Sequence, residues 1–308
     1  MKFAIMGSGG VGGFFGARLA AAGLDTHFIA RGTHLAAMRS GGLEVLSPAG
    51  DFHVEPVQAT DDPATIGPVD CVLFATKLWD LADAALACRP LIGPDTGVIS
   101  LHNGVSAEED IGNVLGPTHV LGGVAEITSF VERPGVIAHR GNFARIRFGE
   151  MDGRQSARTE HMLEAFTKAG IETELSQDIG LLLWLKYVVI VGTSGMTSLT
   201  RQGLGPIRNT AETRALLAQA FDEVIAVGTA KGVAFDSDVG EERMAFVDTL
   251  PETMTSSMAN DLTLGQRLEL EWFAGNLVRM GQALGVPTPL NGLIYNLLKL
   301  NANGRDTS

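Results

Sequence analysis

The chain has 308 residues, of which 45% are hydrophobic and 19% charged, and its formal net charge is −12. The length favours two domains, and the composition is typical of a globular protein with an ample core. The negative charge argues against a nucleic-acid or anionic-membrane partner, because no basic surface is available to neutralise phosphates. Only two cysteines occur, Cys71 and Cys88. We therefore expect no disulfide framework, no metal site and a reducing, cytoplasmic location.

The first predicted element is a strand over residues 2–6, followed by a glycine-rich turn and a helix over residues 14–22. The glycines of the turn have G-x-G-x-x-G spacing in the sequence Gly7-Ser8-Gly9-Gly10-Val11-Gly12. The first glycine permits a tight turn, the second lets a pyrophosphate approach, and the third lets the helix pack on the strand. Free N–H groups and the helix dipole favour a bound phosphate. We predict dinucleotide binding; the alternative is a turn that only serves packing.

The residue after the second predicted strand, over residues 26–30, indicates the type of cofactor. NAD-binding units place an acidic residue about 20 residues after the glycines, where it bonds the ribose 2′-hydroxyl. Here the strand leads into Arg31 and Gly32, without an acidic side chain. Because a guanidinium presents a planar fork of donors to phosphate oxygens, we expect Arg31 to bind the 2′-phosphate of NADP. The alternative is a surface arginine without a ligand.

Two further predicted strands, over residues 70–75 and 97–101, end in polar residues. In an open α/β sheet, ligands lie outside the carboxyl ends of the strands. Lys77 follows the first of these strands and is placed to meet cofactor or substrate, although most lysines are simply solvated. Asn103 follows the second and either forms a turn or bonds a ribose or substrate oxygen. Its neighbour His102 is expected to be structural.

The remaining sequence predicts two types of structure. Up to residue 175 we expect helices over 34–40, 78–91 and 155–169, a hairpin over 43–46 and 52–54, antiparallel strands over 120–130, 136–139 and 144–148, and a strand over 171–174. Beyond residue 176 helical periodicity predominates, over 178–190, 211–231, 239–247, 266–284 and 289–300, with a loop over 203–206. This predicts an α/β fold: an NADP-binding Rossmann-type doubly wound sheet in residues 1–175 and an all-helical substrate and catalytic domain in residues 176–308.

The apolar segment 181–199 is about long enough to span a membrane, but Lys186 lies near its middle. We expect a buried helix of a soluble protein, with no membrane partner. A Rossmann half and a helical half indicate a dehydrogenase with its substrate in the cleft between them. Lys186 is the best candidate to protonate the substrate carbonyl, since burial lowers the pKa of a lysine. The alternative is a lysine that reaches solvent at a helix kink.

Two glutamates, Glu269 and Glu271, lie on the helix predicted over 266–284. Residues two apart point to different faces of a helix, so only one of them can readily face the cleft. For both, the alternative is a solvated helix face.

The order and spacing of these residues resemble the ketopantoate reductase family (2-dehydropantoate 2-reductases) over essentially the whole chain. The resemblance is carried by the glycine turn, Arg31, Thr76-Lys77, His102-Asn103-Gly104, Trp184-Leu185-Lys186, Ser256-Ser257-Met258-Ala259-Asn260-Asp261 and Leu268-Glu269-Leu270-Glu271. It implies that NADPH reduces the 2-keto acid ketopantoate to pantoate, a step toward pantothenate and coenzyme A. It implies site residues with the following roles: Lys186 as general acid, Glu269 orienting the substrate and the lysine, Asn103 and Ser257 binding substrate, Asn103 also near the nicotinamide, Arg31 on the 2′-phosphate and Lys77 lining the cofactor cleft.

Two substrate-binding positions differ from the family's pattern, which usually has Asn four residues after the lysine and often another four later. Here these residues are Ile190 and Ser194, on the same helix face as Lys186. Isoleucine removes an amide that the 4-hydroxyl of ketopantoate would bond, and sites that bond a hydroxyl discriminate strongly on its presence. A paralogue that acts on a more apolar 2-keto acid, in either direction, therefore remains an alternative. A further alternative is a non-catalytic NADP(H)-binding sensor. In each case we expect a monomer or a homodimer.

Overall fold

The computed structural model describes residues 1–305, and these residues form two compact units. The first unit combines Met1–His102 with Ser106–Ile179, and the second combines Asn103–Val105 with the chain from Gly180 onward. The sequence placed the change of structure at residue 175. In the structure the first unit extends to Ile179, and the short segment around Asn103 is grouped with the second unit.

A single mixed sheet organises the first unit. Its strands in the described chain are β1 (Lys2–Met6), β2 (Asp25–Ile29), β3 (Leu43–Leu46), β4 (Phe52–Val54), β5 (Gln58–Thr60), β6 (Val69–Phe74), β7 (Ile92–Ser100), β8 (Val120–Arg133), β9 (Val136–Glu150) and β10 (Glu172–Leu175). Their spatial order is β4-β3-β9-β8-β7-β6-β1-β2-β5, and β10 also pairs with β9. From β5 across to β8 all neighbours run parallel, whereas β8–β9 and β3–β4 are antiparallel.

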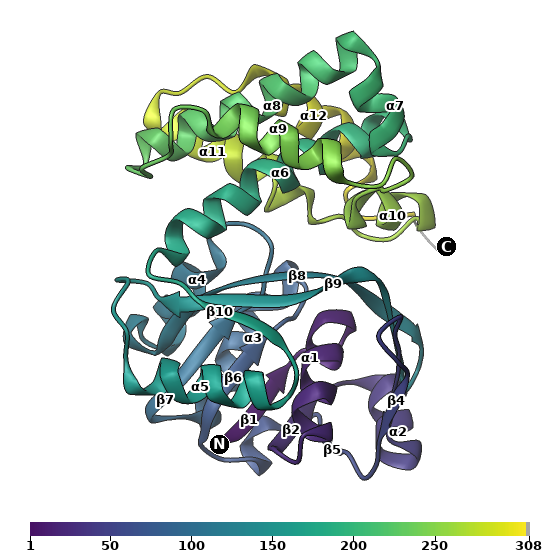
Figure 1. Ribbon diagram of the computed structural model, residues 1–308, viewed down its shortest axis with the longest axis vertical. Helices are drawn as coiled ribbons and strands as arrows, with labels where there is room; N and C mark the ends of the chain where they lie inside the picture. The colour runs from purple at the N-terminus through teal and green to yellow at the C-terminus, as the bar shows by residue number, and fades with distance from the viewer. Residues whose placement is uncertain (306–308) are drawn as a thin grey trace. The chain divides into compact units, whose positions relative to one another are not determined.

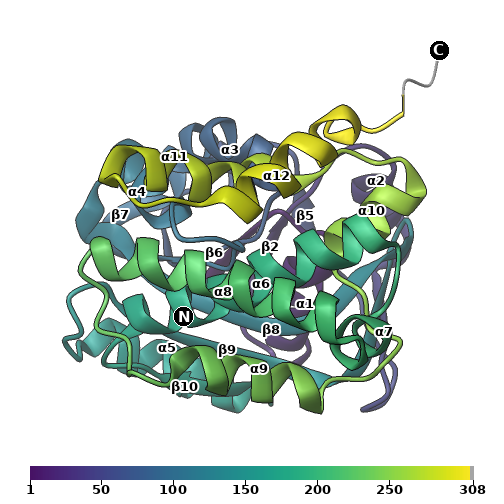
Figure 2. The same ribbon diagram turned by 90° about the horizontal axis from the view of Figure 1, so that it is seen from above.

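Helices cover both faces of this sheet, which confirms the predicted Rossmann-type doubly wound architecture. They are α1 (Gly10–Ala21), α2 (Gly32–Gly41), α3 (Leu81–Cys88), α4 (Ala107–Leu115) and α5 (Ala157–Lys168). Figure 1 and Figure 2 show α3 and α4 on the side of the sheet opposite α5. Phe3 of β1, Phe15 of α1 and Phe166 of α5 are fully buried in one apolar cluster. Each such side chain stabilises the fold by about 1.5–3 kcal/mol.

The predicted hairpin formed by β3 and β4 is confirmed, with the residue bounds expected from the sequence. The prediction of separate strands over 136–139 and 144–148 was wrong, because β9 is continuous. The turn expected at residues 140–142 is instead a bulge. Ile127 of β8 pairs with Ala144, and the next residue, Thr128, pairs with Arg140. The long partner strand carries β9 past the irregularity.

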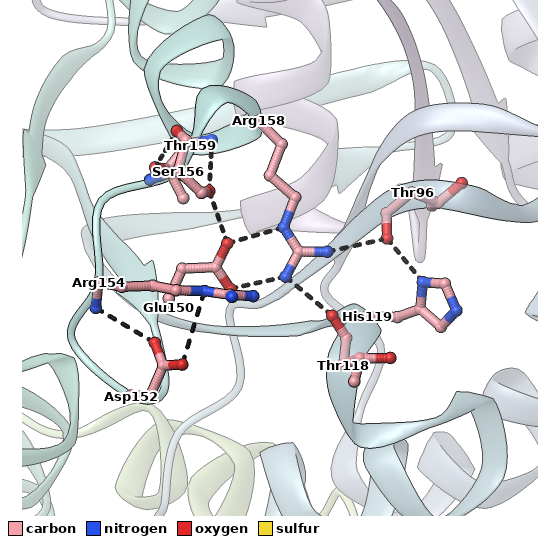
Figure 3. A network of polar contacts seen from close by, with 9 residues as sticks. All are labelled: Thr96, Thr118, His119, Glu150, Asp152, Arg154, Ser156, Arg158 and Thr159. Atoms are coloured by element: carbon pink, nitrogen blue, oxygen red, sulfur yellow. Dashed lines mark hydrogen bonds and ion pairs between the residues drawn. The ribbon is translucent and has the colours of Figure 1, made fainter.

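A polar network joins the end of β9 to the start of α5 (Figure 3). Glu150 accepts hydrogen bonds from Arg158 Nε and Nη2, at 2.8 and 2.6 Å, and from the hydroxyl of Ser156 at 2.7 Å. Arg158 also donates to the carbonyl oxygen of Thr118 at 2.9 Å. The Glu150 side chain is only 4% exposed, so this ion pair is held inside the unit rather than on its surface.

The described part of the second unit contains helices and no strands, as the sequence predicted. Its α-helices are α6 (Ile179–Thr200), α7 (Leu204–Asn209), α8 (Ala211–Ala230), α9 (Val239–Thr249), α10 (Ser257–Leu264), α11 (Ala274–Leu284) and α12 (Pro289–Leu298). α8 packs against α7, α9, α11 and α12 and is the centre of the bundle (Figure 1). α6 begins with the last residue of the first unit.

α6 continues past the helical periodicity expected over 178–190 and ends at Thr200, close to the end of the buried helix expected over 181–199. Gly192 packs against Phe221, and Gly195 packs against Ile294, so both glycines serve close helix contacts. By length and composition α6 could cross a membrane, but 61% of its most apolar window is buried inside the protein. Burial of this kind is typical of a core helix.

Two further predictions for this unit were wrong, and one helix was missed. The segment over 203–206 is not a loop, because α7 begins at Leu204 and accommodates Pro206 in its first turn, where a proline costs no hydrogen bond. The helix predicted over 266–284 begins only at Ala274, and Glu269–Glu271 form a 3₁₀ turn. α10 was missed; Ser256 caps it by accepting a hydrogen bond from the N–H of Ala259 at 3.0 Å.

Candidate active site

The three glycines of the turn between β1 and α1 differ in the space around them. Gly7 has a φ of +94°, and a Cβ there would lie 2.7 Å from the backbone nitrogen of Thr76. A Cβ on Gly12 would collide with the carbonyl oxygen of Gly7. A Cβ on Gly9 would meet nothing within 4 Å. Gly7 and Gly12 therefore serve the fold, and Gly9 leaves open space at the start of α1.

Two neighbouring positions complete the shape of the turn. Gly10 packs directly against the backbone of Ser129 in β8. Ser8 is buried, and both its N–H and its hydroxyl donate to the carbonyl oxygen of Ile29, at 3.2 and 3.0 Å. The N–H and the hydroxyl of Ser8 thus tie the turn to the end of β2. Val11 is half-buried in the first turn of α1.

His34 is a residue that the sequence did not single out, and it links α2 to the glycine turn. The N–H of Gly135 donates to His34 Nδ1 at 3.1 Å, so the neutral ring carries its proton on Nε2. Nε2 then donates to the carbonyl oxygen of Ser8 at 2.9 Å. Burial lowers the pKa of His34 and so favours the neutral ring. The bond to Ser8 opposes this shift but is the weaker effect. The signal in the sequence that could have identified His34 was its position three residues after Arg31.

Arg31 is the residue that precedes α2, and it is exposed. Its extended backbone, with φ −133° and ψ 162°, leads directly from β2 into the helix. The side chain has no ion-pair or hydrogen-bond partner within residues 1–305. An unpaired guanidinium at the carboxyl end of β2 is suited to a phosphate group.

Lys77 and His102 differ in environment, although both follow strands of the parallel sheet. Lys77 is exposed, with its Nζ 5.4 Å from the centre of the Trp79 ring. His102 is buried, with Nε2 3.2 Å from the hydroxyl of Thr76 and Nδ1 3.3 Å from that of Ser100. The imidazole therefore joins the ends of β6 and β7, in agreement with its expected structural role.

In the second unit, Lys186, Ile190 and Ser194 recur every four residues of α6 and share one helix face. Lys186 and Ile190 are half-buried, and Ser194 is 2% exposed. Lys186 is the only charged residue of α6. A lysine on an apolar, partly desolvated helix is suited to proton transfer.

Glu269 lies on the 3₁₀ turn that precedes α11. The residue is 8% exposed, and its carbonyl oxygen accepts the N–H groups of Trp272 and Phe273. The hydroxyl of Tyr187 donates to the carbonyl oxygen of Phe273 at 2.7 Å. The residue next to Lys186 therefore connects the helix of the candidate proton donor to the turn of the candidate orienting carboxylate. Tyr187 was missed, although a tyrosine in so apolar a helix requires a hydrogen-bond partner.

Glu271, two residues away, has a different environment. Its carboxylate accepts hydrogen bonds from the Tyr295 hydroxyl at 2.6 Å and from Arg279 at 3.0 Å. Partial burial opposes ionisation, but these bonds and the nearby positive charges lower the pKa of Glu271 overall. Glu271 is thus held by Tyr295 and Arg279, and Glu269 is the more buried of the two glutamates.

Two other candidate residues belong to the same unit. Asn103 is half-buried, and a Cβ on the following Gly104 would lie 3.8 Å from the carbonyl oxygen of Trp272. The Asn103 segment therefore passes beside the Glu269–Phe273 region. Ser257 is the exposed first residue of α10. The preceding Ser256 lies 2.9 Å from the hydroxyl of Thr197 on α6, which attaches the start of α10 to that helix.

The described residues thus separate into two sets. The glycine turn, Arg31 and Lys77 lie in the first unit, at the carboxyl end of its parallel strands. Lys186, Glu269, Asn103 and Ser257 lie in the second unit. No group of three or more His, Cys, Asp or Glu side chains able to hold a metal ion occurs within residues 1–305.

Comparison with known proteins assigns both units to one family. Residues 3–153 match the family described as ketopantoate reductase PanE/ApbA, and residues 178–302 match its C-terminal domain. A 2-dehydropantoate 2-reductase of Mesorhizobium japonicum is 30% identical, covering 97% of this chain and 97% of that protein. YkpB of Bacillus subtilis, described as an uncharacterized oxidoreductase, is 29% identical, covering 97% of this chain and 98% of that protein.

A solved structure has the same fold over nearly the whole chain. The PanE/ApbA family ketopantoate reductase of Ralstonia eutropha is 30% identical and superimposes with a TM-score of 0.89, covering 98% of each chain. The chain therefore belongs to the ketopantoate reductase family of NADPH-dependent oxidoreductases, which reduce a 2-keto acid.

Proposed function

We propose that the protein reduces ketopantoate to pantoate with NADPH, as a step of pantothenate biosynthesis. The observation that carries this proposal is the arrangement around Lys186 and Tyr187 of α6. Lys186 is the only charged residue of that helix, and the adjacent Tyr187 is bonded to the segment that follows Glu269. A proton donor and a buried carboxylate on connected elements are what the reduction of a carbonyl group requires.

We assign cofactor binding to the first unit. The backbone at Gly9, Gly10 and Val11 would hold the pyrophosphate, and Gly7, Ser8 and Gly12 would give the turn its shape. The space above Gly9 supports this assignment. Arg31 would bind the 2′-phosphate and favour NADPH over NADH, because it is exposed and has no acidic neighbour in sequence. Lys77 would line the cofactor site.

We assign substrate binding and proton transfer to the second unit. Bound NADPH supplies the hydride that adds to C2 of the keto acid. Lys186 gives its proton to the carbonyl oxygen as negative charge develops there, and Glu269 orients both the lysine and the substrate. The Asn103 amide would bond substrate near the nicotinamide, and Ser257 would bond the substrate carboxylate.

One observation favours a second candidate substrate. Ile190 presents a half-buried apolar side chain, and Ser194 a short hydroxyl, on the helix face of Lys186. A face of this kind lacks an amide for the 4-hydroxyl of ketopantoate, and a desolvated hydroxyl without a partner costs about 1–3 kcal/mol. A more apolar 2-keto acid would lose nothing there, and its reduction is the alternative to ketopantoate.

The test is NADPH consumption with a panel of 2-keto acids that includes ketopantoate and branched and aryl analogues. We expect turnover by the wild type with the highest kcat/KM for ketopantoate, and a loss of kcat of about 10²–10⁴-fold in Lys186→Ala. Lys231→Ala, at the exposed end of α8, is the matched control and should behave as wild type. A higher kcat/KM for an apolar 2-keto acid would select the second candidate.

Other outcomes would contradict the assignment. If Lys186→Ala keeps kcat within a few-fold of wild type, the lysine is not the acid. If the wild type consumes NADPH with none of the acids, the protein does not reduce these 2-keto acids, and the roles assigned to Lys186 and Glu269 are wrong.

We also infer a cytoplasmic location, as a monomer or homodimer with the 2-keto acid as its small-molecule partner. Both cysteines, Cys71 and Cys88, are free and buried, which fits a reducing compartment. Cell fractionation and light scattering of the purified protein test these two inferences; recovery in an oxidising compartment or as a larger assembly would contradict them.

A further inference from the structure

Tyr187 makes a buried contact that the reduction itself does not explain. It is fully buried on α6, next to Lys186. Its hydroxyl donates a hydrogen bond of 2.7 Å to the carbonyl oxygen of Phe273, the residue that precedes α11. Burial raises the pKa of Tyr187, so the hydroxyl retains the proton that it donates.

The ring of Tyr187 is itself held in place. It packs edge-to-face against Trp184, with ring centres 5.6 Å apart. A hydroxyl on a ring fixed in this way has little freedom, so the position of Phe273 relative to α6 is fixed as well. Because the N–H of Phe273 donates to the carbonyl oxygen of Glu269, the constraint reaches the turn that carries the buried carboxylate.

A second tyrosine holds the same turn from a different side. Tyr295 of α12 donates to the Glu271 carboxylate at 2.6 Å, and Arg279 donates to that carboxylate at 3.0 Å. The side chains of Glu271 and Arg279 are 39% and 55% exposed, whereas Tyr187 is fully buried. The turn therefore has a solvent-facing attachment through Tyr295 and a buried attachment through Tyr187.

We propose that Tyr187 is a positioning residue: its hydroxyl holds the Glu269 turn against α6, so that Glu269 and Lys186 keep a fixed geometry during proton transfer. This inference rests on the proposed function, in which Lys186 is the proton donor. Tyr187 does not touch the reacting atoms and acts through the backbone of Phe273. Since small displacements of a proton donor or its orienting group slow transfer strongly, the bond acts on the chemical step rather than on substrate affinity.

The chain offers a matched pair of substitutions for the test, Tyr187→Phe and Tyr295→Phe. Tyr295→Phe removes a hydroxyl bonded to Glu271 of the turn, and Tyr187→Phe removes one bonded to Phe273, two residues after the turn. Tyr187→Phe is structurally mild, because the carbonyl oxygen of Phe273 keeps its bond from the N–H of Leu277 at 3.1 Å. Kinetic constants, the solvent deuterium isotope effect on kcat and the thermal unfolding midpoint are measured for both variants beside wild type and Lys186→Ala.

We expect Tyr187→Phe to lower kcat roughly tenfold while KM changes by less than about threefold. The solvent isotope effect should rise, since proton transfer then limits turnover more. Tyr295→Phe should keep kcat within about twofold of wild type, with no change in the isotope effect.

Three outcomes would overturn the inference. The first is wild-type kcat and isotope effect in Tyr187→Phe. The second is an equal loss of kcat in both variants, which would mean that general order of the turn matters. The third is a loss of kcat in proportion to a lowered unfolding midpoint, which would mean a purely structural role. Failure of the proposed function is distinct, because either the wild type would then reduce no 2-keto acid or Lys186→Ala would remain active.

Discussion

Arg31 is the residue on which the choice between NADPH and NADH depends. It is exposed before α2, and Arg39 on the same helix is similarly exposed but pairs with Asp61 at 3.4 Å. We expect Arg31→Ala to raise the KM for NADPH about 10–100-fold, the loss of one or two charge-assisted hydrogen bonds, with little change for NADH. Initial rates with both cofactors measure the ratio of kcat/KM values.

Arg39→Ala is the control for this prediction, because it removes an equal charge from α2 without touching the end of β2. It should leave the NADPH preference unchanged. An Arg31→Ala enzyme that still prefers NADPH as strongly as wild type would show that another group reads the 2′-phosphate.

At the residue scale, the sequence identified candidate catalytic and binding residues better than it identified the residues that hold them in place. Lys186 could be selected because a charge in an apolar helix is costly, and Arg31 because it stands where an acid was expected. His34 and Tyr187 could not be selected in the same way. Their partners are carbonyl oxygens of Ser8 and Phe273, distant in sequence, and the identity of a residue does not indicate which backbone atom it will meet.

At the element scale, the glycine turn separates the requirements of the fold from those of the ligand. Gly9→Ala has room for its methyl group, and Gly9 has an ordinary φ of −76°. We expect this variant to keep its unfolding midpoint within about 2 °C, while the added methyl occupies pyrophosphate space and raises the Kd for NADPH at least tenfold. Gly12→Ala would instead force its methyl into the carbonyl of Gly7 and destabilise the fold by about 1–3 kcal/mol.

Thermal unfolding with and without NADPH measures both effects in one experiment. Gly9→Ala should unfold like wild type but lose the stabilisation by cofactor, and Gly12→Ala should unfold early in its absence. Tight NADPH binding by Gly9→Ala would show that the pyrophosphate does not lie over this glycine.

Elements were predictable where one local pattern dominated, as in the hairpin of β3 and β4 around its proline-glycine turn. Elements were not predictable where contacts between residues distant in sequence determined the local structure. Residues 266–268 are not helical although they fit the periodicity: the N–H of Leu268 donates to the carbonyl oxygen of Ala302 instead of to its own helix. Such bonds override local propensity.

For the whole molecule, composition and the change from alternating to helical periodicity were sufficient to predict a Rossmann-type sheet followed by a helical bundle. These features depend on many residues at once, so single local errors leave them intact. The grouping of Asn103–Val105 with the helical unit was not visible in the sequence. It depends on the packing of a three-residue segment beside Trp272, for which no periodicity exists.

The stability of the first unit is expected to depend on pH through Glu150 (Figure 3). Burial opposes its ionisation, but hydrogen bonds from Arg158 and Ser156 and the charges of Arg158 and Arg154 lower the pKa of Glu150 below its usual 4.5. A carboxyl group with a lowered folded-state pKa binds fewer protons in the folded than in the unfolded protein. Its stabilisation is therefore fully present above pH 4.5 and is lost as the pH falls through the folded-state pKa.

Glu150→Gln tests this linkage, since it keeps the side-chain shape but removes the charge that Arg158 pairs with at 2.6 Å. At pH 7 we expect a loss of about 2 kcal/mol, the value of a buried charge-assisted hydrogen bond. The difference from wild type should shrink as the pH falls below 4.5, because the protonated wild-type carboxyl group no longer contributes. Unfolding followed by circular dichroism at pH 7 and at acid pH measures both differences.

Glu132→Gln, which removes an exposed partner of Arg140 at 3.8 Å, should change stability by less than about 1 kcal/mol at either pH. A difference for Glu150→Gln that stays constant with pH would trace the effect to packing instead of charge.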